Sequence, residues 1–336
     1  MSFYQSKIWE TINKEIYQKP TFDFCLFDRN YFWVIKKIKK GFIELNWYQI
    51  LGVELPESWE SSLEQATYIK EEINKLKRDF AKNYWDIYFQ IGFTNIIDQR
   101  YTNNTKNQET INEIKNLRLQ KQEYMKNTFW LIPSPKENMP VATNYVDLSQ
   151  SLDQIRSDIS KNTKEKIKKW NKKLKFEEAN WKDIKNFYEL WFDILSEKWI
   201  YIIPEQQYFD LINYLNKEKL GKLFVVKDEN DKIAAGSIFA FYKDTVIYLY
   251  GATHKNFGNI WADQKLKFDT IKYAKEKEFK YFDFRGSSPV GFPNHHLQNV
   301  TNFKKGFNGI WEEYLWNYDL VFNKNLYTVY KYLRTN

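Results

Sequence analysis

The sequence predicts a mixed α/β protein of the α+β class with two domains. Its 336 residues exceed the length of an average single domain, and an apolar fraction of 43% is enough for a substantial core. Segments with the helical spacing of apolar residues and segments with the period-two spacing of strands both occur. The stretch PSPKENMP (133–140) contains three prolines, which is typical of a connection between domains. We therefore expect a first domain over 1–145 and a second over 146–318, with the tail 319–336 packing back on the first.

The first half of the chain predicts two helices on either side of a strand. Apolar residues recur at helical spacing over 60–84, among charges of both signs, and a second helix is expected over 110–125. Between them, apolar residues from Trp85 to Phe93 occupy every second position, which is the pattern of a half-buried strand. The polar segment 102–110 predicts a loop.

The second half predicts helices first and then an antiparallel hairpin. Two helices are expected within 146–175 and a long one over 181–197. The remaining predicted elements are strands over 222–228, 232–242, 245–253, 280–286 and 311–318, and helices over 261–277 and 323–336. Helix, helix, antiparallel hairpin, helix and strand is the order of an acetyltransferase-like (GNAT) domain, so we expect that fold for the second domain.

The balance of charge favours a polyanionic partner. The chain has 51 basic and 43 acidic residues, a formal net charge of +8, which suits nucleic acid, a phosphate-bearing substrate or an anionic membrane. The single cysteine, Cys25, excludes an internal disulfide and predicts a reducing, cytoplasmic location. The amino terminus lacks the apolar core of a signal peptide, and no apolar window reaches the roughly 18 residues of a transmembrane segment. Peripheral contact with a membrane surface stays open.

Two strings near the end of the chain predict a ligand site. YFDFRGSSP (281–289) has period-two spacing and ends a strand on an Arg-Gly pair. TNFKKGFNG (301–309) places Phe-Lys-Lys between two glycine-bearing turns. We expect this arrangement to hold a few cations and one aromatic ring at the rim of a sheet, where a ligand could bind.

A basic helix is expected over 161–175, where eight of fifteen residues are lysine. Four of these lysines share one helical face: Lys164, Lys168, Lys172 and Lys175. Such a face is either solvated surface or a patch that follows RNA phosphates, which needs charge without base readout. A second cluster, IKKIKKGF (35–42), includes Lys36, and a solvated loop explains it by default.

The sequence disfavours an acyl-coenzyme A donor and predicts no cofactor. Coenzyme-binding GNAT domains hold the pyrophosphate in a turn of the form Gln/Arg-x-x-Gly-x-Gly/Ala at a helix amino terminus. The corresponding junction, THKNFGNIWADQ (253–264), has Gly258 but no second glycine at the required spacing. His295 and His296 have no cysteine nearby and no ligand spacing to other candidates, so we expect no metal site there.

The carboxy-terminal strings, the basic helix and the segment MPVATNYVDLSQSLDQI (139–155) resemble those of the FemABX family, aminoacyl-tRNA-dependent transferases that form amide bonds. The similarity covers the whole chain and is strongest in the part that begins with this segment. It implies two GNAT-like domains packed side by side. The length of the chain resembles that of members with no long helical-arm insertion.

The resemblance also implies roles for individual residues. Lys304 matches the family lysine that stabilises the oxyanion of the reaction, and Phe303 matches the aromatic residue before it. Predicted substrate contacts are Lys36, Asp98, Tyr208, Tyr250, Asp283 and Arg285, and predicted tRNA contacts are Lys164, Lys168, Lys172, Lys175 and Lys305.

One position departs from the family pattern. Members that use a UDP-linked muropeptide have a phosphate-binding arginine four residues before a tyrosine, whereas this chain has Pro204 before Tyr208. A proline carries neither charge nor an N–H donor. This departure leaves lipid-linked precursors, or another peptide amine, open as acceptors.

The main hypothesis is therefore an aminoacyltransferase that moves an amino acid from aminoacyl-tRNA onto an amine of a peptide acceptor, foremost a peptidoglycan precursor. Two alternatives stay open. One is a GNAT N-acyltransferase that uses acyl-coenzyme A. The other is a non-catalytic protein that binds RNA or an anionic membrane through the same lysines.

Overall fold

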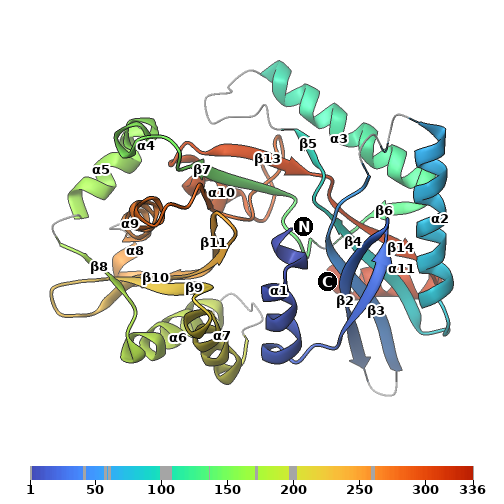
Figure 1. Cartoon of the computed structure of the whole chain (residues 1–336), viewed down its shortest axis with the longest axis horizontal. Coiled ribbons are helices and arrows are strands. Elements are labelled where there is room, and N and C mark those ends of the chain that lie inside the picture. Colours follow the sequence, from blue (N-terminus) through green and yellow to red (C-terminus); the bar gives the residue numbers. More distant parts are fainter. Residues whose placement is uncertain are drawn as a thin grey trace.

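The computed structural model describes most of the chain as two mixed sheets that lie side by side, each covered by helices (Figure 1). The described residues are 2–40, 43–56, 59, 62–98, 108–135, 137–170, 173–196, 203–258 and 262–335. Among them, no helix is both long and apolar enough to cross a membrane.

The first sheet has the strand order β1-β2-β3-β4-β14-β6. The strands are β1 (Thr21–Leu26), β2 (Arg29–Lys40), β3 (Ile43–Val53), β4 (Asp86–Phe93), β14 (Asn317–Val321) and β6 (Leu131–Pro133). β3 and β4 run parallel, and the other neighbours are antiparallel. The crossover from β3 to β4 contains α2 (Leu63–Phe80), which begins after Ser62, whose hydroxyl accepts from the N–H of Gln65 at 3.1 Å.

Helices cover both faces of the first sheet. On one face, α2 and α3 (Gln108–Phe129) pack on Phe89 and Ile91 of β4. On the other face, Tyr327 and Tyr330 of α11 (Lys324–Thr335) pack on Tyr88. The prediction of a half-buried strand here is wrong, because β4 is buried at every position between these two layers.

The second sheet has the strand order β5-β13-β7-β12-β11-β10-β9-β8. The strands are β5 (Ile96–Asp98), β13 (Ile310–Tyr314), β7 (Ala142–Asp147), β12 (Tyr281–Asp283), β11 (Thr245–Thr253), β10 (Ile233–Tyr242), β9 (Gly221–Lys227) and β8 (Lys175–Glu178). The helices α6 (Trp181–Ser196) and α7 (Glu205–Lys217) enclose one core, and α4 (Leu152–Asp158), α5 (Lys161–Trp170) and α9 (Ala262–Glu276) enclose another. The short α8 (Lys255–Gly258) precedes α9, and α10 (Gln298–Lys305) precedes β13.

The two units exchange strands. The single strand predicted over 311–318 is in fact two strands, because β13 pairs in the second sheet and β14 in the first. Between them Leu315, 1% exposed, enters the core of the first sheet, and its N–H donates to the carbonyl of Asn95. We retain the division into two domains at residue 145/146 as a proposal.

The second sheet opens beside β12. β11 and β12 pair in parallel only from Thr245 to Ile247, whereas β11 continues along β10 as far as Thr253. The outer part of β11 therefore leaves β12, and Tyr250 lies in that part. This opening faces the first sheet and positions the cavity described below (Figure 1).

The amino-terminal segment 2–17 bridges the two sheets. Its short helices are η1 (Phe3–Gln5), α1 (Lys7–Thr11) and η2 (Ile12–Ile16), and Figure 1 shows α1 between the two units. Ile8 and Ile12 pack in the core beneath α6 and α7. Gln5, in contrast, hydrogen-bonds the main chain of the first sheet, donating to the carbonyls of Phe32 at 3.1 Å and Leu51 at 2.6 Å. One short segment is thus held by both units.

Candidate functional site

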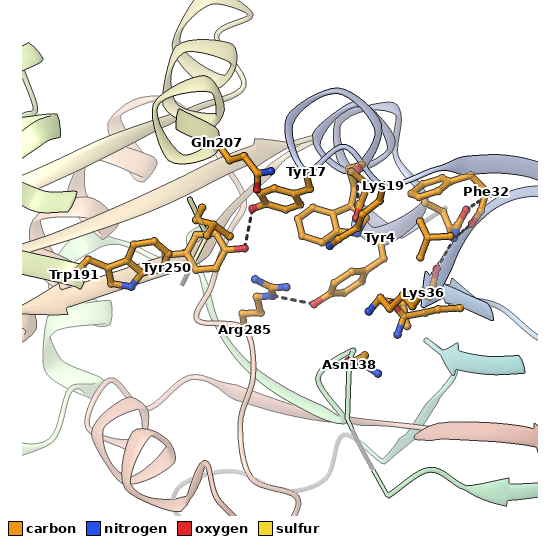
Figure 2. Close-up of a pocket in the computed structure, with 17 residues that line it drawn as sticks. Tyr4, Tyr17, Lys19, Phe32, Lys36, Asn138, Trp191, Gln207, Tyr250 and Arg285 are labelled. Carbon is orange, nitrogen blue, oxygen red and sulfur yellow. Dashed lines mark hydrogen bonds between the residues drawn. The ribbon is translucent and has the colours of Figure 1, made fainter. Parts of the chain in front are cut away.

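A cavity of about 350 Å³ lies between the two sheets (Figure 2). Its wall contains Tyr4, Trp9 and Tyr17 of the amino-terminal segment, Lys36 and Gln49 of the first sheet, Asn138, and Trp191, Tyr250 and Arg285 of the second unit. Aromatic rings, amides and cations from distant parts of the sequence thus surround one cavity.

Arg285 reaches this cavity from the end of β12. Its backbone has a φ of 56°, a left-handed conformation that is uncommon for a residue with a side chain. The turn is held because the N–H of Arg285 donates to the carboxylate of Asp283 at 2.6 Å. The Nε of Arg285 donates to the hydroxyl of Tyr4 at 2.9 Å, and the guanidinium lies 5.8 Å from the ring of Trp9.

Lys304 holds the same turn from below. Its ammonium donates to the carbonyl of Arg285 at 2.8 Å and to the carbonyl of Gly286, and the residue is only 3% exposed. Burial lowers the pKa of Lys304 to about 7, and the charge of Asp283 partly opposes that effect. A buried cation that can lose its proton near neutral pH therefore lies directly under the strand end that carries Arg285.

The expected position of Lys304 at the rim of a sheet is wrong. Residues 301–305 of TNFKKGFNG form the end of α10, in which Thr301 and Lys304, three residues apart, face inward together. The Thr301 hydroxyl accepts from the N–H of Ser288 at 2.7 Å, so this face of the helix organises the loop after β12. Lys304 does not line the cavity; Arg285 does.

The neighbours of Lys304 lie outside the cavity. Phe303 is half-buried, with its ring 5.7 Å from that of Phe307 in the core of the second unit. The ammonium of Lys305 lies 5.8 Å from the ring of Trp311. Phe303 therefore packs against the core of the second unit. Its part in the reaction, beside Lys304, stays a prediction.

The structure brings three of the predicted substrate contacts together. Lys36, Tyr250 and Arg285 line one cavity, although they come from different sheets or strand ends. The hydroxyls of Tyr250 and Tyr17 are 3.1 Å apart, and the ammonium of Lys36 lies 4.7 Å from the ring of Trp47. Residues 35–40 of the cluster that contains Lys36 belong to β2 rather than to a loop.

The other predicted substrate contacts are placed elsewhere. Tyr208 is fully buried, and its hydroxyl donates to the carbonyl of Ile184 at 3.1 Å, so we correct the expectation of substrate contact: this ring packs the core. Asp283 accepts a hydrogen bond from Thr143, lines a neighbouring hollow, and has its pKa raised by burial. The backbone of Asp98 lies in β5, but its side chain is outside the described residues.

The basic helix is shorter than predicted. α5 ends at Trp170, and Lys175 belongs to β8, where it pairs with Glu177, so the four lysines do not share one helical face. Leu174, which follows the end of α5, is 5% exposed and packs in the core of the second unit. Lys168 is exposed, and Lys164 donates to the carbonyl of Ser157 at 3.0 Å. Lys172 lies outside the described residues.

Glu137 lies beside the two histidines, a contact that sequence spacing did not indicate. One potential ligand atom from each of Glu137, His295 and His296 falls within 4.8 Å of the others. The Nδ1 of His295 accepts from the N–H of Leu297 at 3.2 Å, so Nε2 carries the proton and donates to Glu137 at 3.0 Å. This arrangement favours a hydrogen-bonded pair over a metal site.

Sequence reasoning missed the amino-terminal contribution to the site. Ile8, Ile12 and Ile16 recur at a spacing of four, which could have predicted a helix with one buried face. Nothing in the local pattern indicates that Tyr4 and Trp9 meet Arg285, because that contact joins opposite ends of the chain.

Comparisons with known proteins give a family match, similar curated proteins and a similar solved structure. Residues 136–335 match the FemAB family. The lipid II:glycine glycyltransferase of Staphylococcus aureus, in strains USA300 and NCTC 8325 alike, is 22% identical over 193 residues, which cover 57% of this chain and 39% of that protein. The chain thus spans about two fifths of the length of these relatives. A crystal structure of FemX is similar over 98% of this chain and 94% of that one, with 14% identity and a TM-score of 0.63.

The fold of two mixed sheets is similar to that of FemX, and the chain belongs to the FemAB family. The resemblance to FemABX proteins and the predicted α+β class are confirmed.

Proposed function

We propose that this protein is an aminoacyltransferase that moves an amino acid from aminoacyl-tRNA onto an amine of a peptide acceptor, foremost a peptidoglycan precursor. Membership of the FemAB family supports the proposal. So does the similarity to a glycyltransferase whose name includes lipid II. The absence of a second glycine in segment 253–264 favours a donor other than acyl-coenzyme A.

The observation that carries the proposal is the buried ammonium of Lys304 beneath the Arg285–Gly286 turn. In the reaction, the acceptor amine bonds to the ester carbonyl carbon of the aminoacyl-tRNA. The bond to the ribose oxygen then breaks, and the ribose leaves as a hydroxyl with the proton of the amine. Negative charge develops on the carbonyl oxygen in between, and a fixed cation in a site of low dielectric stabilises it.

We give Lys304 two parts in this scheme. Two of its three N–H donors hold the turn that presents Arg285 to the cavity. We assign the third to the developing oxyanion. Because burial lowers its pKa to about 7, the charged form is present at and below neutral pH.

The tRNA contacts in this proposal come from the exposed cations of the second unit. Lys168 and Lys175 are exposed, and the net charge of the chain is +8. Phosphate contacts of this kind make affinity fall as the salt concentration rises. The logarithm of the binding constant falls by about 0.7–0.9 per contact for each tenfold rise in salt concentration. Neutralising Lys168 and Lys175 together should therefore weaken tRNA binding and lower the salt slope.

The test is transfer from a mixture of charged tRNAs to muropeptide and lysine-containing peptide acceptors, read by mass spectrometry. We expect a mass increment that ribonuclease abolishes and that Lys304→Met reduces at least about a hundredfold, as loss of one oxyanion donor does in other enzymes. Lys182→Met, at an exposed position of α6, is the matched control and should transfer normally. A folded protein that transfers from no charged tRNA, but binds coenzyme A, would instead be an ordinary GNAT acyltransferase.

A further inference from the structure

We propose that Tyr4 and Trp9 hold Arg285 as the receptor for an oxyanion of the acceptor, a carboxylate or a phosphate, in the cavity between the sheets. The inference rests on the proposed function and deepens it, since it assigns the chemistry by which the acceptor is anchored. Tyr4 and Trp9 act as positioning residues, and Arg285 makes the contact.

The charge of the cavity wall favours an anion. Three cations line it, Lys19, Lys36 and Arg285, and no aspartate or glutamate is among its described lining residues. The ammonium groups of Lys19 and Lys36 lie over aromatic rings, 4.8 Å from Tyr17 and 4.7 Å from Trp47. The carboxylate nearest to Arg285 in the turn, that of Asp283, bonds the main chain and lines a different hollow.

The guanidinium of Arg285 is oriented but not saturated. Its Nε donates to the hydroxyl of Tyr4 at 2.9 Å, and no hydrogen bond joins its two terminal nitrogens to another residue that the structure describes. Figure 2 shows this guanidinium between Tyr4 and Tyr250, within the cavity. A planar fork with free N–H groups binds carboxylate or phosphate through two parallel hydrogen bonds, which is the strongest form of such recognition.

The orientation comes from the amino-terminal segment. The guanidinium lies 5.4 Å from the ring centre of Tyr4 and 5.8 Å from that of Trp9, so the hydroxyl of Tyr4 and the ring of Trp9 restrict its position. The segment is itself fixed, because Gln5 bonds the first sheet and Ile8 is packed in the second unit. A ligand bound to Arg285 therefore meets a group that needs little further ordering.

The test measures binding by isothermal titration calorimetry, without any transfer step. Three probes separate the two sources of an oxyanion: the tripeptide Lys-Ala-Ala with a free carboxylate, the same tripeptide as its carboxy-terminal amide, and uridine diphosphate. Arg285→Gln should weaken the binding of at least one anionic probe about tenfold or more. Tyr4→Phe keeps the ring and should weaken the same probe by a smaller factor, whereas Arg285→Lys keeps the charge but not the fork and should not restore affinity.

The pattern of loss identifies the ligand. Loss for the tripeptide acid but not for its amide assigns a carboxylate, and loss for uridine diphosphate assigns a phosphate. Arg78→Gln and Tyr84→Phe, both at exposed positions, are the matched controls and should bind every probe as the unaltered protein does. Thermal melts check that each variant folds.

Equal binding of every probe by the unaltered protein and Arg285→Gln would overturn the inference, and so would no binding of any anionic probe at millimolar concentration. Failure of the proposed function looks different. Anion binding that depends on Arg285, in a protein that transfers nothing from charged tRNA, would leave this site standing and remove the reaction.

Discussion

Arg118 of α3 and Glu313 of β13 form a buried ion pair that joins the two units of the molecule. The Nη2 of Arg118 lies 2.6 Å from the Oε2 of Glu313, and both side chains are at most 2% exposed. The same guanidinium nitrogen donates to the carbonyl of Val290 at 2.9 Å, in the loop that follows Arg285. A helix that covers the first sheet is thus bonded to a strand of the second and to the loop beside the cavity.

We expect Glu313→Ala to destabilise the protein by about 3–5 kcal/mol, because it leaves the buried charge of Arg118 without a partner. The double variant Arg118→Met, Glu313→Leu removes both charges and should recover most of that loss. Urea unfolding measures both. A double variant as unstable as the single one would mean that the pair itself, and not the unpaired charge, decides the effect.

Gly52 makes room for the amino-terminal segment. Its φ is +78°, and a Cβ there would lie 2.0 Å from the Oγ of Ser2 and 3.0 Å from the Cβ of Tyr4. Gly52→Ala should therefore lower stability by about 2 kcal/mol and displace Tyr4, because it adds left-handed strain to a steric clash. Gly286→Ala is the matched control for stability, since its nearest contact is an ordinary 3.4 Å. Equal thermal midpoints for the two variants would contradict this prediction.

Asp319 of β14 should give the protein a specific dependence on pH. It is fully buried, accepts from the hydroxyl of Tyr327 at 2.7 Å, and burial raises its pKa to about 7 from 3.8. Between these values the folded state holds a proton that the unfolded state has lost, so stability falls as pH rises from about 4 to 7.

Asp319→Asn removes this titration. Relative to the variant, the unaltered protein should lose about 2–4 kcal/mol of stability across that pH window. Thermal melts at several pH values measure the difference. A difference that stays constant with pH would show that Asp319 does not titrate there.

Lys304 predicts a second pH effect, on transfer. Burial lowers its pKa to about 7 from 10.5, so the ammonium is lost from the folded protein as pH rises through about 7. Single-turnover transfer should then fall about tenfold per pH unit above 7, and Lys304→Arg should flatten the profile because arginine stays charged. The free energy of unfolding should rise with pH between 7 and 10.5, because the unfolded lysine still holds a proton there that the folded protein has lost. A flat profile for the unaltered protein would contradict a role for the ammonium.

Much of the fold could be predicted because it depends on local pattern. The hairpin of β10 and β11 has the predicted bounds to within a residue, and α9 begins and ends within a residue of its prediction. α2 is shorter than its prediction: it begins after Ser62 and ends at Phe80, beyond which residues 81–84 are exposed. Helical and strand periodicities persist over many consecutive residues, so they are visible without knowledge of the partner surface.

The sequence by itself determined the class of fold, the family and the identities of Lys304 and Arg285 as residues of interest. The tertiary structure decided that Lys304 is buried under a turn rather than exposed at a sheet edge, and that segment 311–318 divides between two sheets. It also decided that Tyr4 holds Arg285, a contact between residues 281 positions apart. Such contacts depend on where distant elements pack, and a side chain carries no local sign of the partner it will meet after the chain has folded.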